Sequence, residues 1–172
     1  MKKHIYIAVT LLLAITACKP QKAIDFKQTI DQQERRALDI LVSKGGLDEQ
    51  KLKCLIKHDF KGALLAVDKE ELAFNKIIND ITSLPVEGTQ QGDALKKAAA
   101  DYYTALKDLH LYDRQEIEQQ ALTRDHDEET AKKALDKLIQ LGMDKQKMYG
   151  SVYKKEAAFQ QAMEAFEKAN GI

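Results

Sequence analysis

The sequence predicts an all-α fold, an up-and-down antiparallel bundle of about four helices, and three observations support this. Proline occurs only at Pro20 and Pro85, strand-like alternation of polar and apolar residues is absent, and apolar residues recur at intervals of three and four. The body is also rich in residues that favour helix. No 34-residue repeat is present, which argues against a solenoid. Short connections between amphipathic helices favour antiparallel neighbours.

Residues 1–17 have the pattern of an export signal that precedes the helical body. Lys2 and Lys3 are followed by an uncharged apolar run over residues 5–15. At about 1.5 Å per residue, this run covers only about half of a hydrocarbon core of about 30 Å. It ends in Ile15-Thr16-Ala17-Cys18, which resembles the lipobox of bacterial lipoproteins.

The resemblance implies that the Cys18 sulfur receives a diacylglyceryl group and that the chain is cleaved between Ala17 and Cys18. The new amino group would then be open to acylation, and two or three acyl chains give stable membrane attachment. Residues 18–23 would form the lipidated N-terminus and a short tether. By analogy with lipoproteins sorted in enterobacteria, Lys19 after the cysteine favours the outer membrane with the domain facing the periplasm. Surface display is the alternative.

The helical domain is expected over residues 24–172, and its first helix over 24–42. Gly45-Gly46 supplies a helix stop, and Asp48 is the expected N-cap of a second helix over 48–83, with a kink at Gly62. The residues expected to face inward from these two helices are Ile30, Ala37, Leu38, Leu41, Leu52, Ile56, Ala63, Val67, Phe74, Ile77 and Ile81.

A loop over residues 84–92 leads to a third helix over 93–122, with Asp93 as its cap. Residues 123–130 hold no apolar residue, and they form either a turn or continuous helix. A fourth helix is expected over 130–168, kinked or open to solvent where Gly142 and Lys145 interrupt its apolar seam. The residues expected to face inward from the third and fourth helices are Leu95, Ala99, Tyr102, Leu106, Leu109, Ile117, Leu135, Leu138, Met148, Val152, Phe159, Met163 and Phe166.

Composition limits the possible functions. Removal of residues 1–17 takes away two of 27 basic residues and none of 27 acidic residues, which leaves 155 residues with a formal charge of −2. This length suits one domain, and the chain lacks the basic excess of a nucleic-acid-binding protein. With Cys18 lipidated, Cys54 is the only remaining thiol, so no intramolecular disulfide is expected.

Several groups of residues have side chains of the kind found in metal or catalytic sites. His110, Asp113 and Glu116 could share one side of a helix, but no Glu-x-x-His pair complements them, and a solvated stretch with a local salt link is the favoured interpretation. Cys54 and His58, four residues apart, offer only two ligands. The acidic residues around His126 lack the spacing of a calcium loop. The sequence therefore predicts neither a metal nor another cofactor.

The chain lacks G-x-S-x-G, H-E-x-x-H and a glycine-rich phosphate loop, so a non-enzymatic role is expected. Five tyrosines could meet between the third and fourth helices, where boundary packing is favoured over a binding face: Tyr102, Tyr103, Tyr112, Tyr149 and Tyr153. The leading hypothesis is an envelope lipoprotein whose bundle binds another protein, as an adaptor, inhibitor or immunity-type factor. The alternative is a small-ligand-binding or metal-binding bundle, which requires a polar cluster buried between helices.

Overall fold

The computed structural model describes residues 21–124 and 127–172. Residues 1–17, Cys18 and His126 lie outside the described residues, so the expectations for the signal, the lipidation site and the His126 loop stay predictions. The described residues form these helices, in chain order: α2 (Gln21–Leu41), α3 (Leu47–Ile56), α4 (Phe60–Thr82), α5 (Gly92–Leu111), α6 (Asp113–Leu122) and α7 (Glu128–Asn170).

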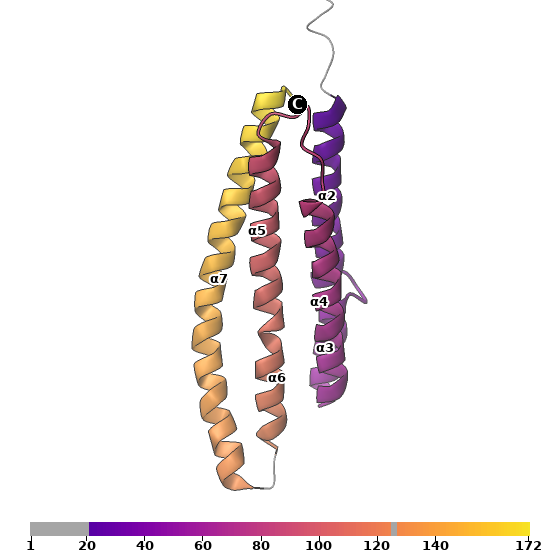
Figure 1. Ribbon diagram of the computed structural model, residues 1–172. Helices are drawn as coiled ribbons and strands as arrows, with labels where there is room; N and C mark the ends of the chain where they lie inside the picture. Colours follow the sequence, from indigo (N-terminus) through magenta and orange to yellow (C-terminus); the bar gives the residue numbers. More distant parts are fainter. Residues whose placement is uncertain (1–20, 125–126) are drawn as a thin grey trace, which may run out of the picture.

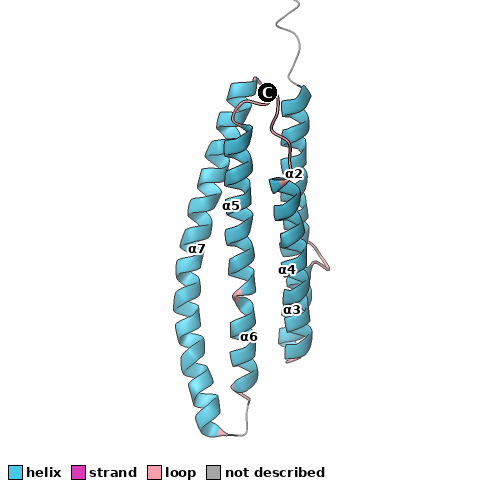
Figure 2. Ribbon diagram, in the orientation of Figure 1, coloured by secondary structure: helices cyan, strands magenta, loops and turns pink. Residues whose placement is uncertain are grey.

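The helices form four arms that run antiparallel, which confirms the predicted fold class (Figure 1). Helices α2 and α3 run in one direction, α4 returns beside them, α5 and α6 descend again, and the long α7 returns along α5 and α6. The described residues outside the helices are confined to loops and turns (Figure 2). No helix in the described ranges combines the length and the apolar character needed to cross a membrane.

The predicted helix over residues 48–83 is wrong in one respect, since a turn at residues 57–59 divides it into α3 and α4. His58 adopts a left-handed conformation with φ 58°, and the backbone N–H groups of His58 and Asp59 donate to the carbonyls of Leu55 and Cys54. This is the Schellman arrangement that ends helices.

The expected kink at Gly62 is also absent, because Gly62 belongs to the cap of α4. The Asp59 carboxylate accepts a hydrogen bond from the Gly62 backbone N–H at 2.9 Å. A Cβ at Gly62 would lie 2.2 Å from that carboxylate, so a larger residue there would displace the Asp59 side chain from its present position.

Helix α3 is rotated away from its predicted orientation. It begins at Leu47, and Asp48 does not cap it; the Asp48 carboxylate contacts Lys51 instead. The side chains of Leu52 and Ile56, expected inside, are 53% and 70% exposed. Adjacent helical residues point about 100° apart, so this rotation places Lys51 inside in place of Leu52.

The third predicted helix divides at Tyr112 into α5 and α6, with helical backbone angles at the junction. Helix α5 begins at Gly92, and its N-cap residue is Gln91, which adopts a left-handed conformation. The prediction of Asp93 as the cap is therefore wrong. Thr123 and Arg124 form a turn after α6, and α7 begins at Glu128, so α6 and α7 are not one continuous helix. The Asp127 carboxylate caps α7 by accepting from the backbone N–H of Thr130 at 2.9 Å.

Helix α7 has no kink near Gly142 and Lys145. Of the two predicted alternatives, the structure shows the second, in which this part of the helix is open to solvent. A Cβ at Gly142 or Gly150 would meet no atom within 4 Å. Leu135, expected inside, is 56% exposed, and Leu38 on α2 is likewise exposed. The predicted core residues of α7 that are confirmed as buried are Val152, Phe159 and Phe166.

The apolar core has two parts. The larger extends over α2, α4, α5 and α7 and includes Phe74, Leu109 and Val152. The smaller is built from Ala63, Val67 and Ile117. On α4, Glu70 lies between Val67 and Phe74 in sequence and is fully buried. A polar layer therefore separates the two apolar clusters.

Candidate functional site: a buried polar layer between two apolar clusters

Lys51 on α3 is the centre of the polar layer, and its side chain is held by carboxylates from three helices. The residue is only 5% exposed. Its Nζ donates to Asp48 Oδ1 at 2.7 Å, to Glu70 Oε2 on α4 at 3.2 Å, and to Asp113 Oδ2 on α6. Such multiple pairing is what allows a lysine to be buried in its charged form.

Helix α7 completes the layer through Lys145. Its Nζ donates to Asp113 Oδ1 and to Glu116 Oε2, so Asp113 bridges two lysines from different helices. The predicted interruption of the α7 seam at Lys145 is therefore the point where this helix joins the layer.

His110 on α5 lies at the edge of the layer. Its ring stacks on Phe74 with a centroid distance of 5.9 Å, and its Nδ1 lies 3.9 Å from Asp48 Oδ1. Burial lowers the pKa of His110 below 6.5, and the charge of Lys51 lowers it further. The imidazole is therefore mainly neutral at pH 7.

The layer contains more acid than base. It holds four carboxylates, from Asp48, Glu70, Asp113 and Glu116, against the ammonium groups of Lys51 and Lys145. With His110 neutral, its formal charge is −2 when all four acids are ionised. Excess negative charge in a buried site favours the uptake of a proton or another cation.

Glu70 is the acid that this excess affects most. Burial raises the pKa of Glu70 to about 7, although the neighbouring Lys51 acts in the opposite direction. Burial also opposes the ionisation of Asp113, but Lys51 and Lys145 outweigh it and lower the pKa of Asp113. The layer therefore joins an ionised Asp113 to a Glu70 that titrates near neutral pH.

The structure divides the predicted group of His110, Asp113 and Glu116. Asp113 and Glu116 contact Lys145, whereas His110 faces Asp48 and Glu70. The favoured interpretation of a solvated stretch is wrong, because Asp113, Glu116 and His110 have side chains only 15%, 20% and 20% exposed.

Lys51 and Glu70 are site residues that the sequence did not predict. The burial of Glu70 could have been predicted from its position, because Glu70 lies at helical spacing from the inward-facing residues Val67, Phe74 and Ile77.

Cys54 and His58 do not share a helix. His58 lies in the turn after α3, and its Nε2 lies 2.8 Å from Arg124 Nη2. Cys54 is half-buried against the smaller apolar cluster. The helical spacing on which the idea of a soft-metal pair depended is therefore absent.

Four of the five tyrosines form two groups, and the fifth, Tyr112, lies at the junction between α5 and α6. Tyr102 and Tyr103 on α5 pack against Phe159 of α7, with centroid distances of 5.7 and 6.1 Å. Tyr149 and Tyr153 stack on each other at 6.5 Å on the outer surface of α7. Tyr102 is half-buried at this boundary, as favoured, whereas Tyr103 is fully buried and its hydroxyl has no hydrogen-bond partner among the described residues. The second group faces solvent.

The outer surface of α7 exposes further large apolar side chains in addition to this tyrosine pair. We call this surface the outer stripe, and its members are Leu135, Ile139, Met143, Tyr149 and Tyr153. Helix α7 therefore has two apolar faces, and only one of them packs against α5 and α6.

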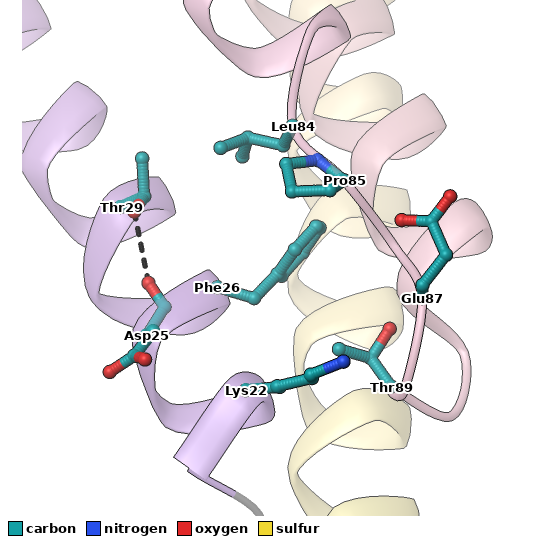
Figure 3. Close-up of a pocket in the computed structure, with 8 residues that line it drawn as sticks. All are labelled: Lys22, Asp25, Phe26, Thr29, Leu84, Pro85, Glu87 and Thr89. Carbon is teal, nitrogen blue, oxygen red and sulfur yellow. Dashed lines mark hydrogen bonds between the residues drawn. The ribbon is translucent and has the colours of Figure 1, made fainter.

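A separate pocket of about 300 Å³ lies where the loop after α4 crosses the start of α2 (Figure 3). The ring of Phe26 forms its inner wall beside Leu84 and Pro85, while Lys22 and Glu87 lie at its rim. The Phe26 ring is already packed on Phe166 at 5.3 Å. This pocket combines core side chains with rim charges of both signs, and it lacks the convergent polar groups of the buried layer.

No family model, no curated protein and no solved structure matches this chain.

Proposed function

We propose that this protein is an envelope lipoprotein, anchored through lipid on Cys18 at the outer membrane and facing the periplasm, whose bundle binds another protein without catalysing a reaction. The signal pattern and the lipobox resemblance support the anchor. The outer stripe of α7 is the observation that supports protein binding, because large apolar side chains exposed along one side of a helix are typical of an interaction site.

The occupant that fits the outer stripe is an amphipathic helix of another envelope protein. The stripe extends from Leu135 to Tyr153, which is about 27 Å along the axis at 1.5 Å per residue. A helix of about 18 residues matches this length. Gly142 and Gly150 lie on the same side and have free space above them, so a partner backbone can approach closely.

Charges at the edge of the stripe specify the partner further. Asp136 and Lys154 lie 18 residues apart, which is five helical turns, so they flank the stripe on the same edge. A matching helix carries a basic residue opposite Asp136 and an acidic residue opposite Lys154, because complementary charges fix the register of an interface.

Site-specific photo-crosslinking in intact cells tests this proposal. A photoreactive residue at Met143 in the stripe is compared with one at Lys133, which lies on another side of α7. We expect Met143 to form an adduct with one non-self protein, identified by mass spectrometry, and the Ile139→Asp change to abolish it. The Lys133 position should give no such adduct. A self-adduct at Met143, equal adducts at both positions, or none at Met143 would contradict the proposal.

A further inference from the structure

We infer that Asp48, Glu70 and His110 form a binding site for one divalent transition-metal ion of the zinc class. This site lies in the polar layer, separate from the outer stripe, and it does not depend on the proposed docking function. One ligand atom from each residue lies within 4.8 Å of those from the other two. The three residues come from α3, α4 and α5, so the packing of the bundle assembles the group.

The first observation that points to a ligand is an oxygen without a partner. Glu70 is fully buried, and its Oε1 has no hydrogen-bond partner among the described residues, whereas its Oε2 accepts from Lys51. Buried polar atoms nearly always have a partner, and the exceptions call for an explanation such as a bound ion.

The second observation is the way in which the neighbours hold the three candidate ligands. Lys51 contacts Glu70 Oε2, which leaves Glu70 Oε1 for a metal, and it also contacts Asp48 Oδ1, the oxygen that lies 3.9 Å from His110 Nδ1. Stacking on Phe74 fixes the His110 ring beside them. Contacts of this kind hold metal ligands in a fixed orientation. Lys51 can keep its contact with Asp113 when the metal is bound.

The third observation is the charge of the layer. Four carboxylates and two ammonium groups leave a formal charge of −2, which one divalent ion neutralises. The same ion offsets the cost of burying ionised Glu70 beside other acids.

The ligand set specifies the class of metal. One imidazole and two carboxylates suit zinc and its neighbours in the first transition row, whereas calcium and magnesium prefer oxygen ligands only. Three protein ligands leave a position for water in a tetrahedral site.

Binding of the metal competes with a proton. Metal ligands bind in their deprotonated form, so the affinity of the site for the metal rises with pH. The charged and titratable groups that face Glu70 are Lys51 and Asp48 from α3, His110 from α5, Asp113 from α6, and Lys145 from α7 through Asp113.

Isothermal titration of the full lipoprotein in detergent micelles, stripped of metal, with zinc chloride tests the inference. We expect one zinc ion per chain and affinity lowered about tenfold or more in both Glu70→Gln and His110→Ala. The matched controls are Glu71→Gln, a neighbouring acid outside the layer, and His58→Ala, a histidine in the exposed turn. Both controls should bind zinc as the unchanged chain does. Circular dichroism checks that each variant is folded.

Cobalt substitution gives a second readout that reports on the ligands themselves. We expect visible absorption bands from bound cobalt in the unchanged chain and their loss in Glu70→Gln. The inference is overturned if the unchanged chain binds no zinc, if Glu70→Gln binds as tightly as the unchanged chain, or if His58→Ala removes binding. None of these results bears on crosslinking at the outer stripe, so the two proposals fail separately.

Discussion

The dependence of stability on pH provides a sharp test of the buried layer, and Glu70→Gln is the informative change. The pKa of Glu70 is about 7 in the folded chain, against 4.5 for an unperturbed glutamate. The folded state therefore binds this proton more tightly than the unfolded state does. The stability that this proton contributes is fully present below pH 4.5, and it is lost as the pH rises through 7.

The size of the effect follows from the shift. A difference of about 2.5 pKa units at about 1.4 kcal/mol per unit gives a full effect of between about 3 and 4 kcal/mol, of which about 3 kcal/mol falls between pH 4.5 and pH 8. Glutamine has nearly the same shape and does not ionise. We therefore expect the free energy of unfolding of Glu70→Gln to rise by about 3 kcal/mol relative to that of the unchanged chain as the pH increases from 4.5 to 8.

Urea unfolding, followed by circular dichroism at pH 4.5, 6, 7 and 8 with a chelator present, measures this difference. The comparison of the two chains is necessary because the pKa of His110 is lowered in the folded state. The contribution of His110 to stability therefore rises with pH over the same range, opposite to that of Glu70. His110 is present in both chains, so its contribution largely cancels. A stability difference that stays flat from pH 4.5 to pH 8 would refute the assignment of the titrating proton to Glu70.

Three further predictions concern the layer, the outer stripe and the anchor. Lys51→Met should lower the free energy of unfolding at pH 7 by about 3–5 kcal/mol in a urea titration, because it leaves buried carboxylates without their cation; a loss below 1 kcal/mol would contradict this. Gly142→Ala and Gly150→Ala should each raise thermal stability by up to about 1 kcal/mol, because the added methyl groups meet no atom, and a fall in melting temperature for both would show that the glycines are needed for packing. Cys18→Ala should abolish incorporation of labelled fatty acid in growing cells, whereas Cys54→Ala should label normally; normal labelling of Cys18→Ala would remove the basis for the anchor.

The predictable part of the fold rests on local signals. Apolar spacing located the four arms, and the loop after α4 falls where Pro85 and its neighbouring glycines predict it. The turn at residues 57–59 was missed because its left-handed residue is His58, whereas helix stops are usually marked by glycine.

The candidate site was predictable only in part. His110, Asp113 and Glu116 were singled out by their spacing on one helix, and all three lie in or beside the layer. Their partners Lys51 and Glu70 come from helices that are distant in sequence, and an interior lysine contradicts the rule that charged residues stay outside. No local pattern reports which charges meet across a core.

The sequence by itself determined that this chain forms helices, roughly where they begin and end, and that short loops make them antiparallel, because these properties depend on neighbouring residues. Only the tertiary structure decided which face of each helix is buried. Helix α3 turns Lys51 inward in place of Leu52, and α7 buries the face with Phe159 while leaving Leu135 and Tyr153 exposed. The physical reason is that α7 has two apolar faces. Which of them is buried depends on how well each face packs against the side chains of α5 and α6, including the charged side chains of those helices.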